Sequence, residues 1–237
     1  MEYNTDLFEE ATIERILSQL QVLLNNIIRQ PETPIAKISL LPESEKNRLV
    51  NEWNDTQVDF PERVCVHQLF EDQAEYTPDA IAVTLGHEKL TYRELNEKAN
   101  QLAHWLRMQN VGPNISVGIH LPRSIELVIS MLAVAKSGGC YIPFDASCPK
   151  DRIEQMLQDA KPLMLMTDSI RGRQFKRSQM QLFLVDEGWE DVLTLSTKNL
   201  ISGVSTNDPM YQIYTSGSTG AMKGVVVPHK AAYTHMQ

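Results

Sequence analysis

The amino-acid sequence predicts an α/β protein with a doubly wound, mainly parallel sheet, preceded by a helix and a linker. Strand-like and helix-like segments alternate from residue 66 onward, which is typical of a parallel sheet covered by helices. The apolar segment 115–121 shows no polar alternation, as in a strand buried on both faces. A separate helical pattern at 12–29 precedes a stretch rich in Pro, Glu, Asn and Asp.

The N-terminal helix is expected over residues 12–29, with Thr12 as its N-cap and Pro31 and Pro34 beyond its end. Residues 1–8 are compatible with a short strand. The apolar positions recur with a period near 3.6 and are Ile13, Ile16, Leu17, Leu20, Leu23, Leu24, Ile27 and Ile28. So wide an apolar face must pack against something. It indicates the last helix of a preceding domain; the alternative is a helix docked on the domain that follows.

The expected organisation has three parts: residues 1–34 with the long helix, a linker over 35–63 with a short helix around 43–51, and an α/β domain over 64–237. In the α/β domain a helix over 66–76 precedes a strand over 80–85 that turns back through 86–90. Thr91 and Glu94 then form the sequence pattern of a capping box, which predicts a helix to about Arg107.

The remaining elements follow from caps, glycines and apolar runs. Ser124 is expected to cap a helix that Gly138 and Gly139 end, and Pro149 to begin another. Strands are expected at 115–121, 140–144, 163–167, 181–185, 210–214 and 225–227.

The segment from Tyr214 to Gly224, YTSGSTGAMKG, is dominated by small and hydroxylic residues and lies between two apolar runs. Glycines let backbone N–H groups approach an anion closely, and the hydroxyls and Lys223 add donors and charge. The segment therefore predicts a phosphate-binding loop between two strands. It fits neither GxxxxGK[ST] nor GxGxxG. A flexible Ser/Gly linker is the alternative interpretation.

Bulk properties exclude several classes of function. The chain has 237 residues and a net charge of −8, which argues against nucleic acid as a partner. Its three cysteines form no CxxC pair and its histidines no HExxH pattern, so we expect a reducing cytoplasm and no metal site. Neither a signal peptide nor a transmembrane run is found, so no membrane partner is expected.

The segment 215–224 resembles the AMP-binding signature of the adenylate-forming superfamily, TSG[ST]TGxPKG, with Met222 in place of the usual proline. Proline fixes φ, so its loss predicts a looser loop. Residues 90–96 (LTYRELN) and 132–145 (LAVAKSGGCYIPFD) resemble the two preceding core motifs of amino-acid adenylation domains in nonribosomal peptide synthetases. These two motifs are expected to be structural. The three motifs occur in the order of that family.

The N-terminal part resembles the end of a condensation domain and its junction to an adenylation domain, through residues 2–8, the long helix, and the segments LLP (40–42) and WNDT (53–56). Residues 1–34 are then a condensation-domain remnant, 35–63 the interdomain linker, and 64–237 a truncated adenylation domain. Two alternatives remain. One is a non-catalytic remnant that acts as an interaction module. The other is a different adenylate-forming enzyme, such as an acyl-CoA ligase.

The resemblance implies a parent ligase of secondary metabolism that converts an amino acid and ATP to aminoacyl-AMP and loads it on a phosphopantetheine carrier domain. Condensation and carrier domains of the same synthetase are the implied partners, and Mg the implied metal. In the loop, Thr215, Ser216, Ser218 and Thr219 are the expected phosphate donors, Gly217 and Gly220 allow close approach, and Lys223 supplies charge. His229 is expected to be structural. No catalytic residue is assigned, and the family's later motifs, with the amino-acid pocket and metal ligands, are expected beyond Gln237. The chain is therefore not expected to be active alone.

Overall fold

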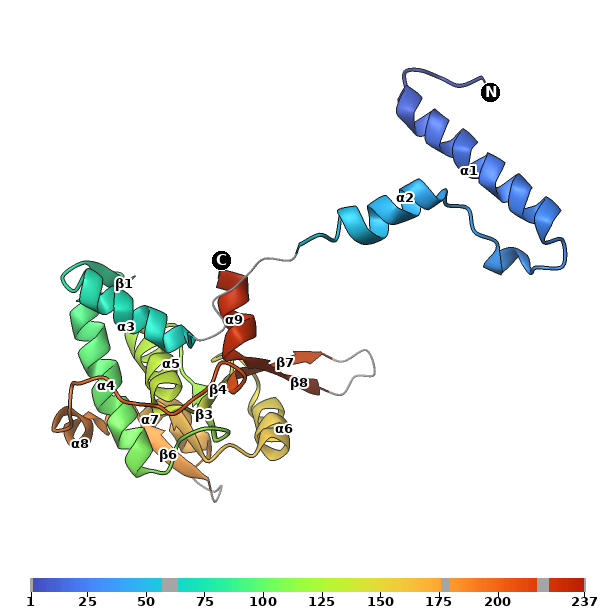
Figure 1. Ribbon diagram of the computed structural model, residues 1–237. Helices are drawn as coiled ribbons and strands as arrows, with labels where there is room; N and C mark the ends of the chain where they lie inside the picture. The colour runs from blue at the N-terminus through green and yellow to red at the C-terminus, as the bar shows by residue number, and fades with distance from the viewer. Residues whose placement is uncertain (1, 57–63, 176–179, 217–221, 237) are drawn as a thin grey trace. The chain divides into compact units, whose positions relative to one another are not determined.

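The computed structural model describes residues 2–56, 64–175, 180–216 and 222–236. The chain forms two compact units, Met1–Asp59 and Phe60–Gln237. Each unit is described by itself, with the elements labelled in Figure 1.

The first unit is helical. Its elements are α1 (Glu10–Arg29), the 3-10 helix η1 (Ile35–Lys37), α2 (Glu43–Asn47) and the π-helical turn η2 (Arg48–Glu52) that continues α2. The prediction of Thr12 as N-cap was wrong, because the helix begins at Glu10 and Glu9 is the N-cap, without a side-chain cap. The suggested strand before it was also wrong. The Asn4 side chain accepts a hydrogen bond from the Asp6 N–H (2.8 Å) and the backbone turns there instead.

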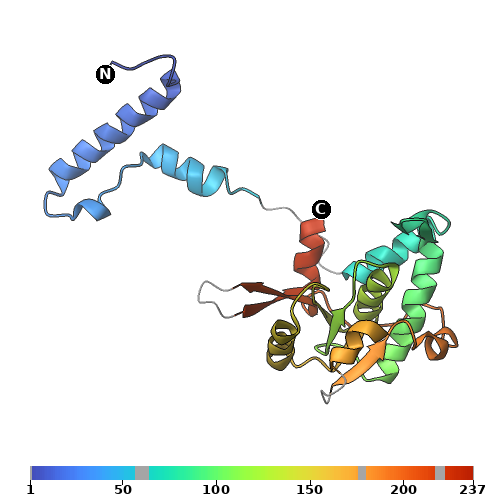
Figure 2. The same ribbon diagram turned by 180° about the vertical axis from the view of Figure 1, so that it is seen from behind.

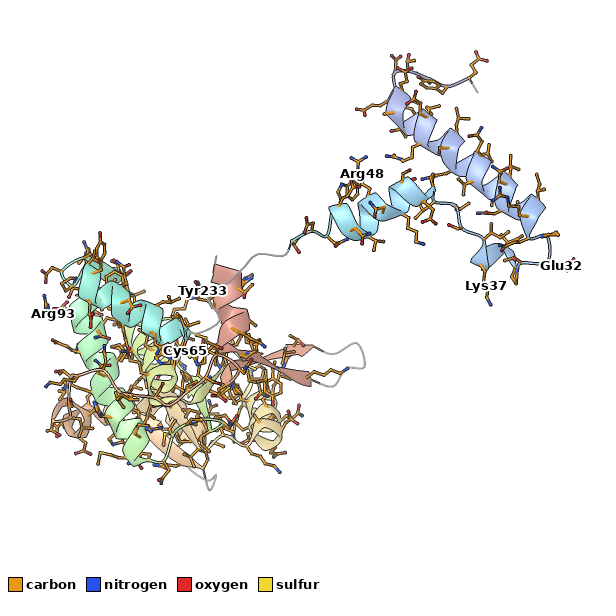
Figure 3. All side chains as sticks on the ribbon, viewed as in Figure 1. Glu32, Lys37, Arg48, Cys65, Arg93 and Tyr233 are labelled. Carbon is orange, nitrogen blue, oxygen red and sulfur yellow. The ribbon has the colours of Figure 1, made fainter. Side chains whose placement is uncertain are left out.

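Few contacts hold α1 and α2 together. Gln19 Nε2 donates to Glu45 Oε2 over 3.0 Å. In η2, the Arg48 guanidinium lies 5.1 Å from the centre of the Trp53 ring (Arg48 is labelled in Figure 3). Much of the apolar face of α1 is exposed within this chain: Leu17, Leu20, Leu24, Ile27 and Ile28.

The second unit is built on a six-stranded sheet with the order β6-β5-β3-β4-β7-β8. The first five strands pair in parallel, and β8 is antiparallel to β7. The predicted doubly wound, mainly parallel sheet is thus confirmed. The strands are β3 (Ser116–His120), β4 (Cys140–Pro143), β5 (Met164–Thr167), β6 (Gln181–Leu184), β7 (Pro209–Ser216) and β8 (Met222–Pro228).

Helices cover both faces of the sheet (Figure 1, and from behind in Figure 2). On one face α4 (Tyr92–Met108), α5 (Ile125–Ser137) and α8 (Trp189–Leu193) enclose a core that includes Leu102, Ile119 and Met166. On the other face α6 (Lys150–Ala160) packs through Ile153, Met156 and Leu157 onto Ile142 and Leu165. The smaller elements are α3 (Val66–Tyr76), the separate hairpin β1 (Ile81–Leu85) and β2 (Glu88–Thr91), α7 (Ser169–Gly172), η3 (Arg173–Phe175) and α9 (His229–Met236).

The predicted caps are largely confirmed. Thr91 and Glu94 form the capping box of α4, and Ser124 Oγ accepts from the Leu127 N–H at the start of α5. Gly138 ends α5 in the left-handed region, with φ of +90°. Pro149 was expected to be the first residue of α6; it is instead the N-cap, and the helix begins one residue later, at Lys150.

A segment without regular structure, residues 194–208, connects α8 to β7. The Asn100 side chain donates to Thr197 O over 2.7 Å and to Asn199 Oδ1 over 2.8 Å. Gln101 Nε2 donates to Leu193 O over 2.7 Å. These amide groups of α4 therefore fix the path along which the chain enters β7.

Candidate functional site

The predicted phosphate loop lies at one end of the β7–β8 hairpin. Thr215 pairs with Lys223, and Ser216 pairs with Met222. We call these two pairs the hairpin neck. Both Thr215 and Lys223 are exposed. The apolar runs on either side of the loop form adjacent antiparallel strands in this register.

The structure brings together three of the predicted site residues: Thr215, Ser216 and Lys223. The others, Gly217, Ser218, Thr219 and Gly220, lie outside the described residues.

A pocket of about 400 Å³ lies beside the hairpin neck. It is formed by the carboxyl end of β4, the start of α6 and the adjoining ends of β7 and β8. Ligands of open α/β sheets commonly bind at the carboxyl ends of strands. The residues that line it are Pro143, Phe144, Asp145, Ser147, Cys148, Pro149, Arg152, Met156, Ile213, Tyr214 and Met222.

Tyr214 connects the hairpin to α6. Its hydroxyl donates to Asp159 Oδ2 over 2.5 Å, lies 3.3 Å from Met156 O, and accepts from Gln212 Nε2 over 3.3 Å. Burial, reinforced by the Asp159 carboxylate, raises the pKa of the Tyr214 hydroxyl well above its usual value. Tyr214 therefore stays protonated and acts as a hydrogen-bond donor at the side of the pocket.

Met222, at the position of the usual proline, is the first residue of β8. Its Sδ accepts a hydrogen bond of 3.0 Å from Arg152 Nε on α6. The expected loosening concerns residues outside the described part of the chain and stays a prediction. Sequence reasoning missed Arg152, because the helical pattern of α6 assigns the core to Ile153, Met156 and Leu157 and leaves Arg152 on the outer face.

Two buried histidines, His67 and His229, lie together at the end of the hairpin opposite the neck. His229, which follows β8, packs edge-to-face on His67 with ring centres 5.4 Å apart, and the Val66 N–H lies 3.4 Å from His229 Nδ1. Burial lowers the pKa of His229 to about 4 despite Asp208 nearby. Burial, with His229 and Lys136 nearby, lowers the pKa of His67 to about 3. Both imidazoles are neutral, and the interior position of His229 suits the structural role expected for it.

Among residues 2–56, 64–175, 180–216 and 222–236, no three His, Cys, Asp or Glu side chains are placed to hold a metal ion. Over the same ranges, the helices are too short or too polar to span a bilayer.

The site lies in a segment with a clear family match. Residues 70–237 match the model of the AMP-binding enzyme family. The chain belongs to this family. Residues 1–50 match the condensation-domain model. The two matches, in this order, identify the chain as a nonribosomal peptide synthetase segment that comprises the end of a condensation domain and the N-terminal part of an adenylation domain.

Similar proteins include three large synthases. The chain is 40% identical over 232 residues to tyrocidine synthase 3 of Brevibacillus parabrevis, covering 97% of this chain and 4% of that protein. It is 40% identical to gramicidin S synthase 2 of Brevibacillus brevis (97% and 5% covered) and 39% identical to chondramide synthase cmdD of Chondromyces crocatus (99% and 6% covered). The chain thus spans a small share of each relative's length.

Solved structures give the same result for the fold. The synthetase FmoA3 with bound alpha-methyl-L-serine-AMP matches with a TM-score of 0.77 and 28% identity, over 96% of this chain and 25% of that one. The N-terminal subdomain of NpsA from Klebsiella oxytoca matches with a TM-score of 0.62 and 27% identity, over 71% of this chain and 43% of that one.

Proposed function

We propose that the synthetase to which this chain corresponds activates an amino acid with ATP, forming aminoacyl-AMP and pyrophosphate, and transfers the aminoacyl group to a phosphopantetheine thiol on a carrier domain. The observation that carries the proposal is the hairpin neck, with Thr215 opposite Lys223, in a chain of the AMP-binding enzyme family. The condensation match at residues 1–50 favours a peptide synthetase over an acyl-CoA ligase.

In this proposal the chain binds the polyphosphate of ATP. Thr215, Ser216, Ser218 and Thr219 donate hydrogen bonds, Gly217 and Gly220 allow the backbone to approach, and Lys223 neutralises charge. Catalysis of this reaction depends on orientation and charge stabilisation rather than on a protein nucleophile. Magnesium would enter with ATP and neutralise phosphate charge.

The partners proposed for this function are the condensation and carrier domains of the same synthetase. We also propose a cytoplasmic location. The three cysteines, Cys65, Cys140 and Cys148, are free thiols, which suits a reducing compartment.

The test is binding of MgATP to the 237-residue chain, with Lys223→Ala as the variant and Lys230→Ala as the matched control. Both lysines are exposed, and Lys230 lies at the opposite end of the hairpin, at the start of α9. Loss of a charge-assisted contact should weaken binding about tenfold in Lys223→Ala only. Equal weakening in both variants, or none in either, would contradict the role of Lys223.

A second measurement concerns activity. We expect the chain alone to show no amino-acid-dependent exchange of pyrophosphate into ATP. Exchange above the no-enzyme background would show that this chain holds a complete adenylation site.

A further inference from the structure

The side chain of Arg152 lies against the hairpin neck. Arg152 belongs to α6, lines the pocket, and donates from Nε to Met222 Sδ over 3.0 Å. Met222 pairs directly with Ser216, the last residue of β7. The guanidinium therefore contacts the strand residue whose backbone pairs with Ser216, one of the residues proposed to bind phosphate.

The charge of Arg152 is not neutralised by the described part of the chain, where it forms no ion pair. The one carboxylate that lines the pocket, Asp145, accepts from the N–H and hydroxyl of Ser147, over 2.7 Å and 2.6 Å. A thioether is a weak acceptor and occupies one of the five guanidinium donors. The arginine thus keeps most of its donors for another group.

A solvated surface arginine is the simplest alternative, since Arg152 is exposed, but one contact of its side chain and the fixed position of its helix distinguish Arg152 from such a residue. Its Nε is anchored by Met222, whereas Lys150, on the same helix, pairs with Glu154 over 3.3 Å. The helix itself is fixed, because Ile153 is fully buried and Asp159 binds the Tyr214 hydroxyl. A guanidinium held in place in this way loses little conformational entropy when it binds an anion.

We infer that Arg152 is a second cation of the phosphate site and donates to the polyphosphate of ATP from the α6 side of the hairpin neck. This inference rests on the proposed function. The planar fork of arginine matches two phosphate oxygens. Met222, which replaces the family's usual proline, supplies the acceptor that orients this fork.

The experiment measures binding of two probes, MgATP and inorganic tripolyphosphate, to the full 237-residue chain by calorimetry. The variants are Arg152→Gln, Arg152→Lys, Lys223→Ala and the control Lys150→Gln, which removes a charge two residues away on the same helix. We expect Arg152→Gln to weaken the binding of both probes about tenfold. Lys150→Gln should weaken their binding by less than about twofold. Arg152→Lys, which keeps the charge and loses the fork, should lie between them.

Each other outcome overturns a defined part of the proposal. If Lys223→Ala weakens binding and Arg152→Gln matches Lys150→Gln, the role of Arg152 is refuted and the proposed function stands. If Arg152→Gln weakens the binding of MgATP but not that of tripolyphosphate, Arg152 does not contact phosphate. If the wild-type chain binds neither probe, the phosphate site in this chain is refuted together with Arg152. Thermal unfolding of each variant checks its fold, and Arg152→Lys replaces Arg152→Gln as the test if the latter is unfolded.

Discussion

Lys136 of α5 is fully buried, and its ammonium group pairs with the carboxylate of Glu71 of α3. The Lys136 side chain has 0% exposure and that of Glu71 has 14%. Asn199 Oδ1 lies 3.3 Å from the same ammonium. The Lys136 ammonium group therefore joins α5 to α3 by an ion pair and to the segment that leads into β7 by a hydrogen bond. Burial lowers the pKa of Lys136, and Glu71 partly offsets this effect.

Glu71→Gln should destabilise the chain by about 3–5 kcal/mol at pH 7, because it leaves a buried cation without its counter-charge. Lys136→Met should cost less, since Glu71 retains some contact with water. Urea unfolding of both variants measures the difference. A double variant, Lys136→Met with Glu71→Met, should recover much of the loss; additive losses would show that the two residues are not coupled.

The pH dependence of Glu71→Gln provides a further check. Without the carboxylate, the folded-state pKa of Lys136 falls further below the unfolded value of about 10.4. The unfolded state then binds more protons, so the stability of this variant should rise with pH up to about 10. Unfolding at pH 7 and pH 9 would show a smaller deficit at pH 9; an unchanged deficit would contradict the buried-charge explanation.

The buried pair of His67 and His229 should make the chain sensitive to acid. Their folded-state pKa values are about 3 and about 4, against 6.5 in the unfolded chain. Stability should therefore fall as pH decreases from 6.5 towards 4, by about 1.4 kcal/mol per histidine at pH 5.5. Burial also lowers the pKa of His120, so a residual slope is expected.

The measurement is urea unfolding between pH 7.5 and pH 5 for the wild type and for His67→Gln with His229→Gln. In the double variant, the slope of the free energy of unfolding against pH should be smaller by the equivalent of up to two protons. His87→Gln, at an exposed position, should keep the wild-type slope. If the slopes of wild type and double variant coincide, the acid sensitivity comes from other groups.

Gly138→Ala should destabilise the chain more than Gly86→Ala. Both glycines have positive φ, +90° and +60°. A Cβ at Gly138 would lie 2.8 Å from Val204 Cγ2 and 3.3 Å from Ser202 O, whereas a Cβ at Gly86 has no atom within 4 Å. The backbone penalty of about 1 kcal/mol is common to both, so the excess at Gly138 reports the packing against the segment before β7. Equal shifts in thermal unfolding would contradict that close contact.

Tyr214→Phe should lower stability by about 1 kcal/mol, because the hydroxyl loses its bonds to α6 while Asp159 remains solvated. Tyr76→Phe is the control, since Tyr76 is 84% exposed. Chemical denaturation of both variants provides the comparison. A Tyr214→Phe variant as stable as the control would show that the hairpin does not depend on this bond.

The sequence predicted most helices and strands of the second unit because their ends are marked locally. The capping box at Thr91 and the glycine at 138 mark helix ends by hydrogen bonding and by φ, and neither needs tertiary information. The start of α1 was misplaced because Thr12 is a good N-cap residue, but Glu10 and Ala11 are also good helix formers and extend the helix.

The long-range polar contacts could not be predicted in the same way. An apolar run does not reveal whether a strand is parallel or antiparallel, so the β7–β8 pairing is known only from the structure. Lys136 belongs to the helical pattern as a polar residue, and its burial depends on Glu71, which is 65 residues away. Arg152 and Met222 are separated by 70 positions, and neither residue type suggests the other.

The start of α3 is bonded to the chain on either side of the hairpin. Cys65 Sγ lies 3.7 Å from Val204 O, His67 Nε2 lies 3.3 Å from Ser202 Oγ, and Val66 meets His229. Figure 3 marks Cys65 at this end of α3 and Tyr233 on α9, the helix that begins at His229. These contacts limit where modules can be recombined. A crossover placed after His67 would join a foreign α3 start to a native hairpin base, whereas one placed before Cys65 would transfer both halves of these contacts together.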